Sequence, residues 1–215
     1  DPVEYDIEGI IQIPMHESIG LTFARTLRAF LRQDPDIIMV GEIRDKETAE
    51  IAIQAALTGH LVLSSLHTND APSAITRLLE LGVPAYLIKA TLIGVVAQRL
   101  VRVLCPKCKQ ESTVALDLWK SLTSNWETTV PKKAYEPVGC LECRETGYKG
   151  RSGIYEIMPF TEALHEYAES AAELPRLRRQ AYKEGMCSLR LSGARKVATG
   201  MTSILEVLRV APDSN

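Results

Sequence analysis

The sequence predicts an α/β fold that carries a cysteine-bearing lobe and a helical C-terminal part. Residues 1–104 alternate short apolar runs with amphipathic segments, which is the pattern of strands and helices packed in layers. Two Cys-x-x-Cys pairs lie within residues 105–152, and the pattern after residue 156 is that of helices. A length of 215 residues accommodates one full domain and such a satellite lobe.

A clear break separates the first predicted helix from the first predicted strand. Residues 23–32 place apolar side chains on one helical face and arginines on another. The residues Gln-Asp-Pro-Asp at 33–36 end this helix, because proline and the residue before it disfavour its continuation. The wholly apolar run at 37–40 predicts a buried strand of a parallel sheet.

A second helix and a second strand repeat this order. Asp45 is suited to cap a helix over about 46–58, and Gly59 is suited to end it. The apolar run at 61–66 then predicts another buried strand.

The elements that follow are predicted to be mainly helical. Residues 72–81 and 86–103 have helical patterns, and the second carries arginines near its end. Residues 151–156 predict a short strand or a turn. Three further helices are expected at about 173–184, at about 189–199 and after a capping box formed by Ser203 and Glu206.

The spacing of the cysteines predicts a metal site. Four of the five cysteines form two Cys-x-x-Cys pairs, Cys105 with Cys108 and Cys140 with Cys143. Each pair directs two thiolates at one tetrahedral zinc ion, and two pairs complete a structural site. Two disulfides are disfavoured by the near-neutral composition of an intracellular protein, and a dithiol redox site by the lack of a thioredoxin-like unit. Cys187 is expected to be a small buried apolar residue.

Charge and hydropathy disfavour several classes of protein. The chain carries 25 Lys and Arg against 27 Asp and Glu, a net charge of −2, so it lacks a polybasic coat for nucleic acid or a membrane surface. No apolar run has the length of a membrane span, and the first residues do not form a signal peptide. Because the first residue is not Met, we expect a fragment of a longer protein.

Polar side chains follow both predicted strands, where an open α/β sheet places its reactive groups. Glu42 follows the first strand and is able to order the water shell of a magnesium ion. Arg44 lies two residues further on and is suited to contact a phosphate oxygen, and His67 follows the second strand. Taken singly, these residues have ordinary structural explanations, such as an acid that caps the next helix.

Taken together, these clusters resemble the secretion-ATPase superfamily, which contains the motors of type II secretion and type IV pilus assembly. The resemblance is carried along nearly the whole chain by DPVE at 1–4, RQDPDIIMVGEIRD at 32–45, TGHLVLSSLHTND at 58–70, AQRL at 97–100 and the two cysteine pairs. It implies a partial RecA-like ATPase core at 1–104, with a parallel sheet flanked by helices, a tetracysteine zinc-binding lobe at 105–152 and a helical subdomain at 153–215.

The resemblance also implies roles for individual residues. Glu4, in the aspartate box, would polarise the attacking water, and Glu42, in the Walker B motif, would serve the magnesium ion. His60 and His67 match the histidine box, which lies near the γ-phosphate and the subunit interface. Four arginines would either contact phosphate or form charge pairs between domains or subunits; they are Arg28, Arg32, Arg44 and Arg77.

The resemblance also indicates the kind of motor. The cysteine lobe is typical of secretion and pilus-extension motors and is absent from retraction motors, so a retraction motor is disfavoured. The stretches at 92–100 and 184–186 look more like type II secretion than pilus extension. The implied protein is a homo-hexamer that hydrolyses ATP with Mg²⁺ and carries Zn²⁺. It would be cytoplasmic, would attach to the inner membrane through the cytoplasmic part of a platform protein, and would bind no nucleic acid.

One motif of the superfamily is missing from the sequence. The Walker A string Gly-x-x-x-x-Gly-Lys-Ser/Thr does not occur in the 215 residues. The chain by itself is therefore expected to bind ATP poorly, and hydrolysis is expected of the full-length parent. A function of another class stays open, in which this fragment is a non-catalytic assembly module stapled by zinc. A nucleic-acid-binding zinc protein is disfavoured by the net charge of −2.

Overall fold

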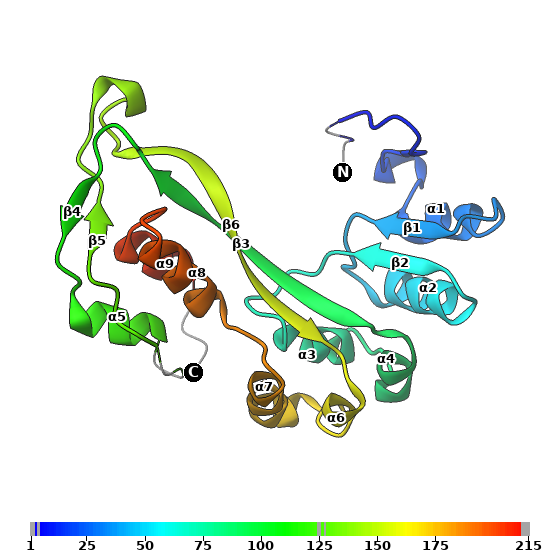
Figure 1. Cartoon of the computed structure of the whole chain (residues 1–215). Helices are drawn as coiled ribbons and strands as arrows, with labels where there is room; N and C mark the ends of the chain where they lie inside the picture. Colours follow the sequence, from blue (N-terminus) through cyan, green and yellow to red (C-terminus); the bar gives the residue numbers. More distant parts are fainter. Residues whose placement is uncertain (1–2, 4, 124–125, 127, 212–215) are drawn as a thin grey trace. The chain divides into compact units, whose positions relative to one another are not determined.

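The computed structural model describes residues 3, 5–123, 126 and 128–211 (Figure 1). The chain divides into two compact units. Unit 1 comprises Asp1–Thr68, Pro72–Ile93 and Phe160–Arg178, and unit 2 comprises Asn69–Ala71, Gly94–Pro159 and Arg179–Asn215. The bounds of these units cut across the three segments named from the sequence, because residues 94–104 group with the cysteine lobe and residues 160–178 group with the N-terminal part.

Unit 1 contains a two-stranded parallel sheet (Figure 1). β1 (Ile37–Val40) pairs with β2 (Leu61–Ser64) in parallel, as the sequence predicts. α1 (Phe23–Phe30) and α2 (Lys46–Leu57) pack on this pair. The residues of this core are Ala24, Leu27, Ile38, Val40, Ile51, Ala52 and Ala55. The other elements of unit 1 are η1 (Glu17–Ile19), α3 (Ser73–Glu80), α4 (Ala85–Thr91), α6 (Glu162–His165) and η3 (Ala171–Glu173).

The ends of α2 lie where the sequence predicts them. The Asp45 carboxylate accepts a hydrogen bond from the Thr48 backbone N–H at 2.8 Å, which satisfies one of the free donors of the first turn. After the helix, Gly59 has φ 99°, a left-handed conformation that glycine adopts without strain. Local side-chain chemistry is therefore sufficient to bound this helix.

The prediction that both strands are buried is wrong for the described chain. Ile38 and Val40 are buried against the helices, whereas Ile37 is 60% exposed and Met39 is 75% exposed. Leu61 and Leu63 of β2 are also exposed. Successive strand residues point to opposite faces of a sheet, so the wholly apolar run supplies two apolar faces. The described helices cover only the face that carries Ile38 and Val40.

The prediction of one helix over 86–103 is also wrong. α4 ends at Thr91, and β3 (Gly94–Leu104) follows it. The segment is rich in valine, a β-branched residue that favours strands, and β3 pairs antiparallel with β6 (Tyr148–Pro159). The short strand or turn predicted at 151–156 is the middle of this 12-residue strand. A partner about fifty residues away in the sequence thus decides the conformation of both segments.

Unit 2 is built on the β3–β6 ribbon (Figure 1). β4 (Gln110–Ser112) pairs antiparallel with β5 (Ala134–Glu136), and the cysteine lobe also contains α5 (Leu116–Thr123) and η2 (Leu141–Cys143). α7 (Leu174–Lys183) leads from unit 1 into unit 2, where α8 (Leu189–Ala198) and α9 (Ile204–Val210) follow. The core joins the ribbon to α5, α8 and α9 through Val101, Trp119, Leu122, Ile154, Leu189, Val197 and Val207. Among the described residues, no helix combines the length and hydropathy that a membrane span requires.

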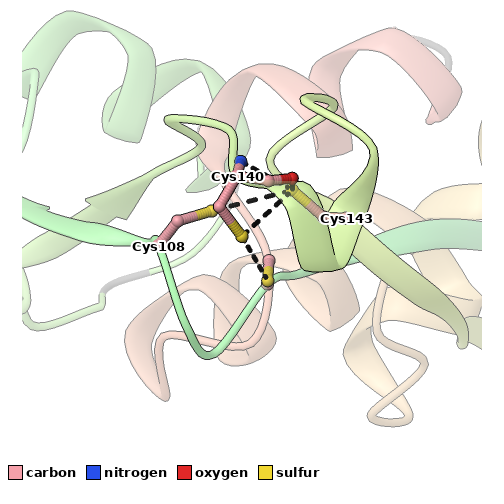
Figure 2. A group of neighbouring side chains, drawn as sticks. Cys108, Cys140 and Cys143 are labelled. Atoms are coloured by element: carbon pink, nitrogen blue, oxygen red, sulfur yellow. Dashed lines mark hydrogen bonds between the residues drawn. The ribbon is translucent and has the colours of Figure 1, made fainter.

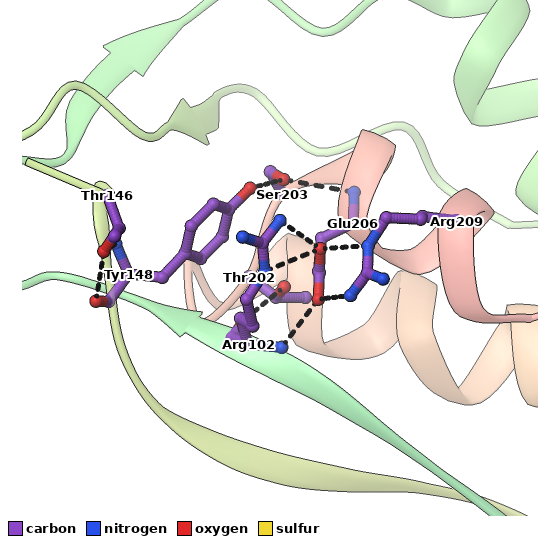
Figure 3. Close-up of polar contacts among 7 residues, drawn as sticks. All are labelled: Arg102, Thr146, Tyr148, Thr202, Ser203, Glu206 and Arg209. Carbon is purple, nitrogen blue, oxygen red and sulfur yellow. Dashed lines mark hydrogen bonds and ion pairs between the residues drawn. The ribbon is translucent and has the colours of Figure 1, made fainter.

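A buried carboxylate ties α9 to β3. Glu206 is 1% exposed, and its side chain accepts hydrogen bonds from the backbone N–H of Arg102 at 3.0 Å and from the guanidinium groups of Arg102 and Arg209 at 2.7 Å each (Figure 3). Ser203 caps α9 by accepting from the Glu206 backbone N–H, so this half of the predicted capping box is confirmed. The carboxylate itself pairs with the arginines. Burial works against its ionisation, but the two guanidiniums outweigh burial and lower the pKa of Glu206 from 4.5 to about 2.

We expect Glu206→Gln to reduce the free energy of unfolding of this chain by about 3 kcal/mol at pH 7, since a pKa unit corresponds to about 1.4 kcal/mol. The folded state binds the Glu206 proton more weakly than the unfolded state does. The stabilisation is therefore complete above pH 4.5 and is lost as the pH falls toward about 2. Denaturant unfolding between pH 2.5 and pH 7 measures this, and the two proteins converge in acid. An unchanged difference across this range would contradict the assignment.

Candidate functional site

The first candidate site lies just beyond the carboxyl ends of β1 and β2. Two hydrogen bonds join the segments that follow the strands. The Ile43 N–H donates to the Ser65 carbonyl at 3.0 Å, and the Ser65 hydroxyl donates to the Gly41 carbonyl. They bring together the residues that follow the two strands. His67 Nε2 lies 2.8 Å from Glu42 Oε2, so the polar groups predicted at the two strand ends are also in contact with each other.

The Glu42 carboxylate is held ionised in a partly dry position. Glu42 is only 6% exposed, and its other oxygen forms an ion pair with Arg44. The hydrogen bond from Arg44 lowers the pKa of Glu42 below 4.5, against the effect of burial, and His67 contributes in the same direction. The His67 side chain is 86% exposed. The arrangement therefore offers a fixed carboxylate beside an accessible imidazole, which suits proton transfer or the ordering of water around a cation.

His60 lies at the opposite end of β2 from His67 and does not join this cluster. Its Nδ1 lies 2.9 Å from the carbonyl oxygen of Ala55, so this nitrogen carries the proton and donates to the end of α2. The Thr58 hydroxyl lies 3.1 Å from the same nitrogen. The geometry thus gives His60 a capping function at the C-terminus of the helix.

The arginines named from the sequence are dispersed. Arg44 belongs to the Glu42 cluster. Arg28 pairs with Glu47 of α2 at 2.8 Å, and Arg77 pairs with Glu80 on its own helix at 3.4 Å. Arg32 is exposed just after α1. Glu4 lies outside the described residues. Of the predicted nucleotide-site residues, the structure therefore brings together Glu42, Arg44 and His67.

Sequence reasoning missed two residues that make specific contacts with the segments around His67 in the sequence. Ser65 carries both hydrogen bonds that hold the strand ends together, and nothing in an apolar run singles it out. Glu156 is fully buried on β6, and its Oε1 accepts a hydrogen bond from the Ala71 N–H. The strand period could have indicated that Glu156 is buried. Ile154, Glu156 and Met158 are alternate residues, so they point to the same face of β6, and the residues between them are exposed.

The second candidate site is formed by the two cysteine pairs, whose ligand atoms converge (Figure 2). The Cys105 and Cys140 sulfurs are 3.9 Å apart, those of Cys108 and Cys143 are 3.8 Å apart, and those of Cys140 and Cys143 are 3.7 Å apart. All four cysteines are free thiols, so the alternative of two disulfides is not observed. Four sulfurs at about 2.3 Å from a tetrahedral zinc ion lie about 3.8 Å from one another, so the donor set fits this metal.

Local backbone geometry shapes this cluster. After η2, Arg144 and Glu145 both have positive φ, at 53° and 59°, which folds the second Cys-x-x-Cys pair into a tight knuckle. Gly147, at φ 74°, has no room for a side chain, because a Cβ there would lie 2.4 Å from Pro137 Cβ. Its carbonyl accepts from the Cys105 N–H at 2.9 Å, and its own N–H donates to Cys143 Sγ at 3.2 Å. This glycine thus links the two knuckles.

Backbone N–H groups donate hydrogen bonds to two of the four sulfurs. Burial disfavours the thiolate of Cys143, but the N–H groups of Cys140 and Gly147 donate to its sulfur and lower its pKa from 9.0 to about 6. The Gly139 N–H donates to Cys108 Sγ at 3.4 Å. Such N–H to sulfur contacts are the outer-shell interactions expected around a metal-binding thiolate.

Comparison with known proteins gives a consistent result. A family model described as "Type II/IV secretion system protein" matches residues 1–209. The type IV pilus assembly ATPase TfpB of Acinetobacter baylyi is 55% identical over 212 residues, which cover 99% of this chain and 36% of that protein. The type II secretion system protein E of Pseudomonas aeruginosa is 48% identical over 210 residues, which cover 98% of this chain and 41% of that protein. The chain thus spans about two fifths of the length of these relatives.

A solved structure shares the fold. The crystal structure of the pilus retraction motor PilT with bound ADP aligns with a TM-score of 0.61 and 25% sequence identity, over 90% of this chain and 44% of that one. The α/β fold with a parallel sheet and helices, which the sequence predicts, is confirmed by this likeness and by the β1–β2 pair.

Proposed function

Since this chain belongs to the type II/IV secretion system protein family, we propose that it is the C-terminal part of a motor that hydrolyses ATP to ADP and phosphate. The observation that carries the proposal is the contact of Glu42 with His67 beyond the ends of two parallel strands. Carboxyl ends of parallel strands are where α/β proteins bind nucleotides, and an ionised carboxylate there suits a hydrated magnesium ion. The core would be of the RecA-like type.

We assign the roles within the site as follows. Glu42 orders water around Mg²⁺, and Arg44 holds Glu42 ionised until nucleotide binds and then becomes available to a phosphate oxygen. His67, exposed and in contact with Glu42 through one nitrogen, reports the state of the γ-phosphate through that contact. Glu4 polarises the attacking water. His60 acts from the far end of β2, so its contribution is to the subunit interface.

The dispersed arginines fit a second part of this proposal. Arg28, Arg32 and Arg77 lie on or next to the helices α1 and α3 of unit 1, and they are at least partly exposed. Exposed ion pairs such as Arg28 with Glu47 contribute little to stability, so these arginines can exchange partners at low cost. We propose that they pair with phosphate or with a neighbouring subunit in a homo-hexamer.

The phosphate-binding loop would come from the rest of the parent protein. This chain contains no Walker A string, and its relatives are more than twice as long as the matched region. Backbone N–H groups and a lysine are required to cradle the α and β phosphates. The full-length parent is therefore the catalytic species, and this chain alone is a zinc-stapled module without turnover.

The cysteine cluster is proposed to hold one structural Zn²⁺. All four sulfurs lie within 4.8 Å of one another, three of their separations are 3.7 to 3.9 Å as in a tetrahedral site, and N–H groups donate to Cys108 and Cys143. Such an ion contributes folding free energy to the lobe at 105–152 and leaves no position open for catalysis. The four cysteines lie far from Glu42 in the sequence, which is consistent with a purely structural role for the ion.

Two biological settings fit this motor. The stretches at 92–100 and 184–186 favour assembly of a pseudopilus in type II secretion. The identity of 55% with a type IV pilus assembly ATPase, against 48% with a type II secretion protein, favours pilus extension as the second candidate. Retraction is disfavoured, because the identity with a retraction motor is only 25%. In either setting the motor would lie in the cytoplasm and act on the cytoplasmic part of an inner-membrane platform protein.

The experiment that tests the proposal uses the full-length parent. We expect Mg²⁺-dependent ATP turnover by the parent and a fall of about 100-fold or more in Glu4→Gln, since removal of a general base costs about 10² to 10⁴ in rate. Complementation of a deletion strain then separates the two settings, through protein export in one case and surface pili in the other. A parent with no turnover, or a Glu4→Gln variant at the wild-type rate, would contradict the assignment.

A further inference from the structure

A three-residue segment that follows His67 closely in the sequence belongs to the other unit of the fold. Residues Asn69–Ala71 group with unit 2, whereas the residues on both sides of them group with unit 1. This segment connects β2 and His67 to α3. The residues before and after this segment belong to unit 1, so the grouping of the segment with unit 2 reflects its own contacts with that unit.

The contact is made by a carboxylate in the middle of a strand. Glu156 of β6 has no exposed surface, and its Oε1 accepts a hydrogen bond from the Ala71 backbone N–H at 2.8 Å. Ala71 is itself fully buried, and Asp70 before it is 5% exposed. A buried backbone N–H needs an acceptor, so Glu156 satisfies a donor that would otherwise carry a desolvation cost.

The identity of residue 156 is unusual for its position. Ile154 and Met158 occupy the same buried face of β6, and the residue paired with Glu156 across the ribbon is Ala97. An apolar side chain would complete this face, because a buried carboxylate has a desolvation cost that apolar packing avoids. A carboxylate here is therefore best explained by the polar groups that it binds, and the Ala71 N–H is one of them.

The anchored residue lies close to His67 along the chain. Three residues separate His67 from Ala71, so the two Cα atoms lie within about 14 Å of each other in any conformation. The other end of the connection is fixed by the hydrogen bonds of Ser65 and by the contact of His67 with Glu42. Loss of the hydrogen bond at Ala71 would remove this restraint from the far end of the connection, and the position of the exposed imidazole would become less defined.

We propose that Glu156 is a positioning residue for ATP hydrolysis, which holds the connection carrying His67 through the backbone of Ala71. This inference rests on the proposed function, because it takes His67 to be part of the ATP site. Glu156 acts through His67 and touches neither nucleotide nor water. The role requires an acceptor oxygen at the end of the side chain and does not require its charge.

The test compares three variants of the full-length parent. Glu156→Leu removes the acceptor at nearly constant volume, and we expect kcat to fall about 10- to 100-fold with little change in KM for ATP, as for a misplaced catalytic group. Glu156→Gln keeps the acceptor, and we expect it to restore kcat to near the wild-type value. Glu206→Leu is the matched control, since Glu206 is also a buried carboxylate of unit 2 that accepts a backbone N–H. It is expected to lower the melting temperature without lowering kcat per folded molecule.

A double variant separates positioning from general stability. Because Glu156 acts through His67, adding Glu156→Leu to His67→Ala is expected to cause no further loss of the residual turnover, whereas independent effects would multiply. Wild-type turnover in Glu156→Leu, a Gln variant as slow as the Leu variant, or a multiplied loss in the double variant would each overturn the inference. Wild-type turnover in His67→Ala alone would instead overturn the proposed role of His67 in the ATP site.

Discussion

From the proposed function, we expect Glu42→Gln to lower ATP turnover of the full-length parent by about 100-fold or more, because it removes a charge from a partly dry site. Gln keeps the size of the side chain, so the backbone after β1 stays in place. It removes the negative charge that faces Arg44 and His67, and a neutral amide no longer orders the waters of a magnesium ion. Steady-state phosphate release measures the effect.

The control for Glu42 lies on the neighbouring helix. Glu50 of α2 makes an exposed ion pair with Lys46 at 3.6 Å, and exposed pairs of this kind contribute less than about 1 kcal/mol. Glu50→Gln is therefore expected to keep the wild-type turnover and melting temperature. If Glu42→Gln hydrolysed ATP as fast as Glu50→Gln does, then Glu42 would have only the structural role of closing the end of β1.

Cys140→Ser is expected to reduce the zinc content of the purified protein from about one ion per chain to none. The Cys140 sulfur lies within 3.9 Å of both Cys105 and Cys143, so its removal leaves an incomplete tetrahedron. Zinc binding supplies about 10 to 16 kcal/mol in small zinc modules, which is more than the short strands β4 and β5 can replace. Elemental analysis measures the metal, and hydrogen exchange across 105–152 measures the expected loss of structure.

The fifth cysteine provides a matched control for this result. Cys187 lies outside the cluster, where it accepts a hydrogen bond from Arg195 at 3.4 Å. Cys187→Ser is expected to retain zinc and the melting temperature. Unit 1, whose core of Ala24, Leu27, Val40 and Ile51 contains no cysteine, is expected to stay folded in Cys140→Ser. A wild-type protein that lacks metal and holds two disulfides would refute the site.

The elements that could be predicted from the sequence are those whose ends and faces are specified by nearby residues. Asp45 and Gly59 bound α2, and the apolar run at 37–40 forms a parallel strand, because capping and turn chemistry act over three or four residues. Glu42 and His67 were predicted to follow neighbouring strands, and the structure shows that their side chains are in contact. Parallel strands end at the same edge of their sheet, so polar residues after neighbouring strands meet there.

The failed predictions concern segments whose partners are distant in the sequence. Residues 94–104 have a pattern that fits a helix as well as a strand, and pairing with β6 selects the strand. The apolar run of β1 indicates two apolar faces, yet the described residues supply helices for only one of them. Local periodicity carries information about neither the partner nor the covering layer.

By itself, the sequence indicated the residues of both candidate sites: the spacing of two cysteine pairs predicted four sulfurs directed at one ion, and an acid and a histidine were predicted to follow two neighbouring strands. Only the tertiary structure decided which distant groups the buried carboxylates bind. The Glu156 contact with Ala71 spans 85 residues, and the Glu206 contact with Arg102 spans 104 residues. Buried carboxylates are stable only where donors from other parts of the chain surround them, and those donors are identified only when the chain has packed.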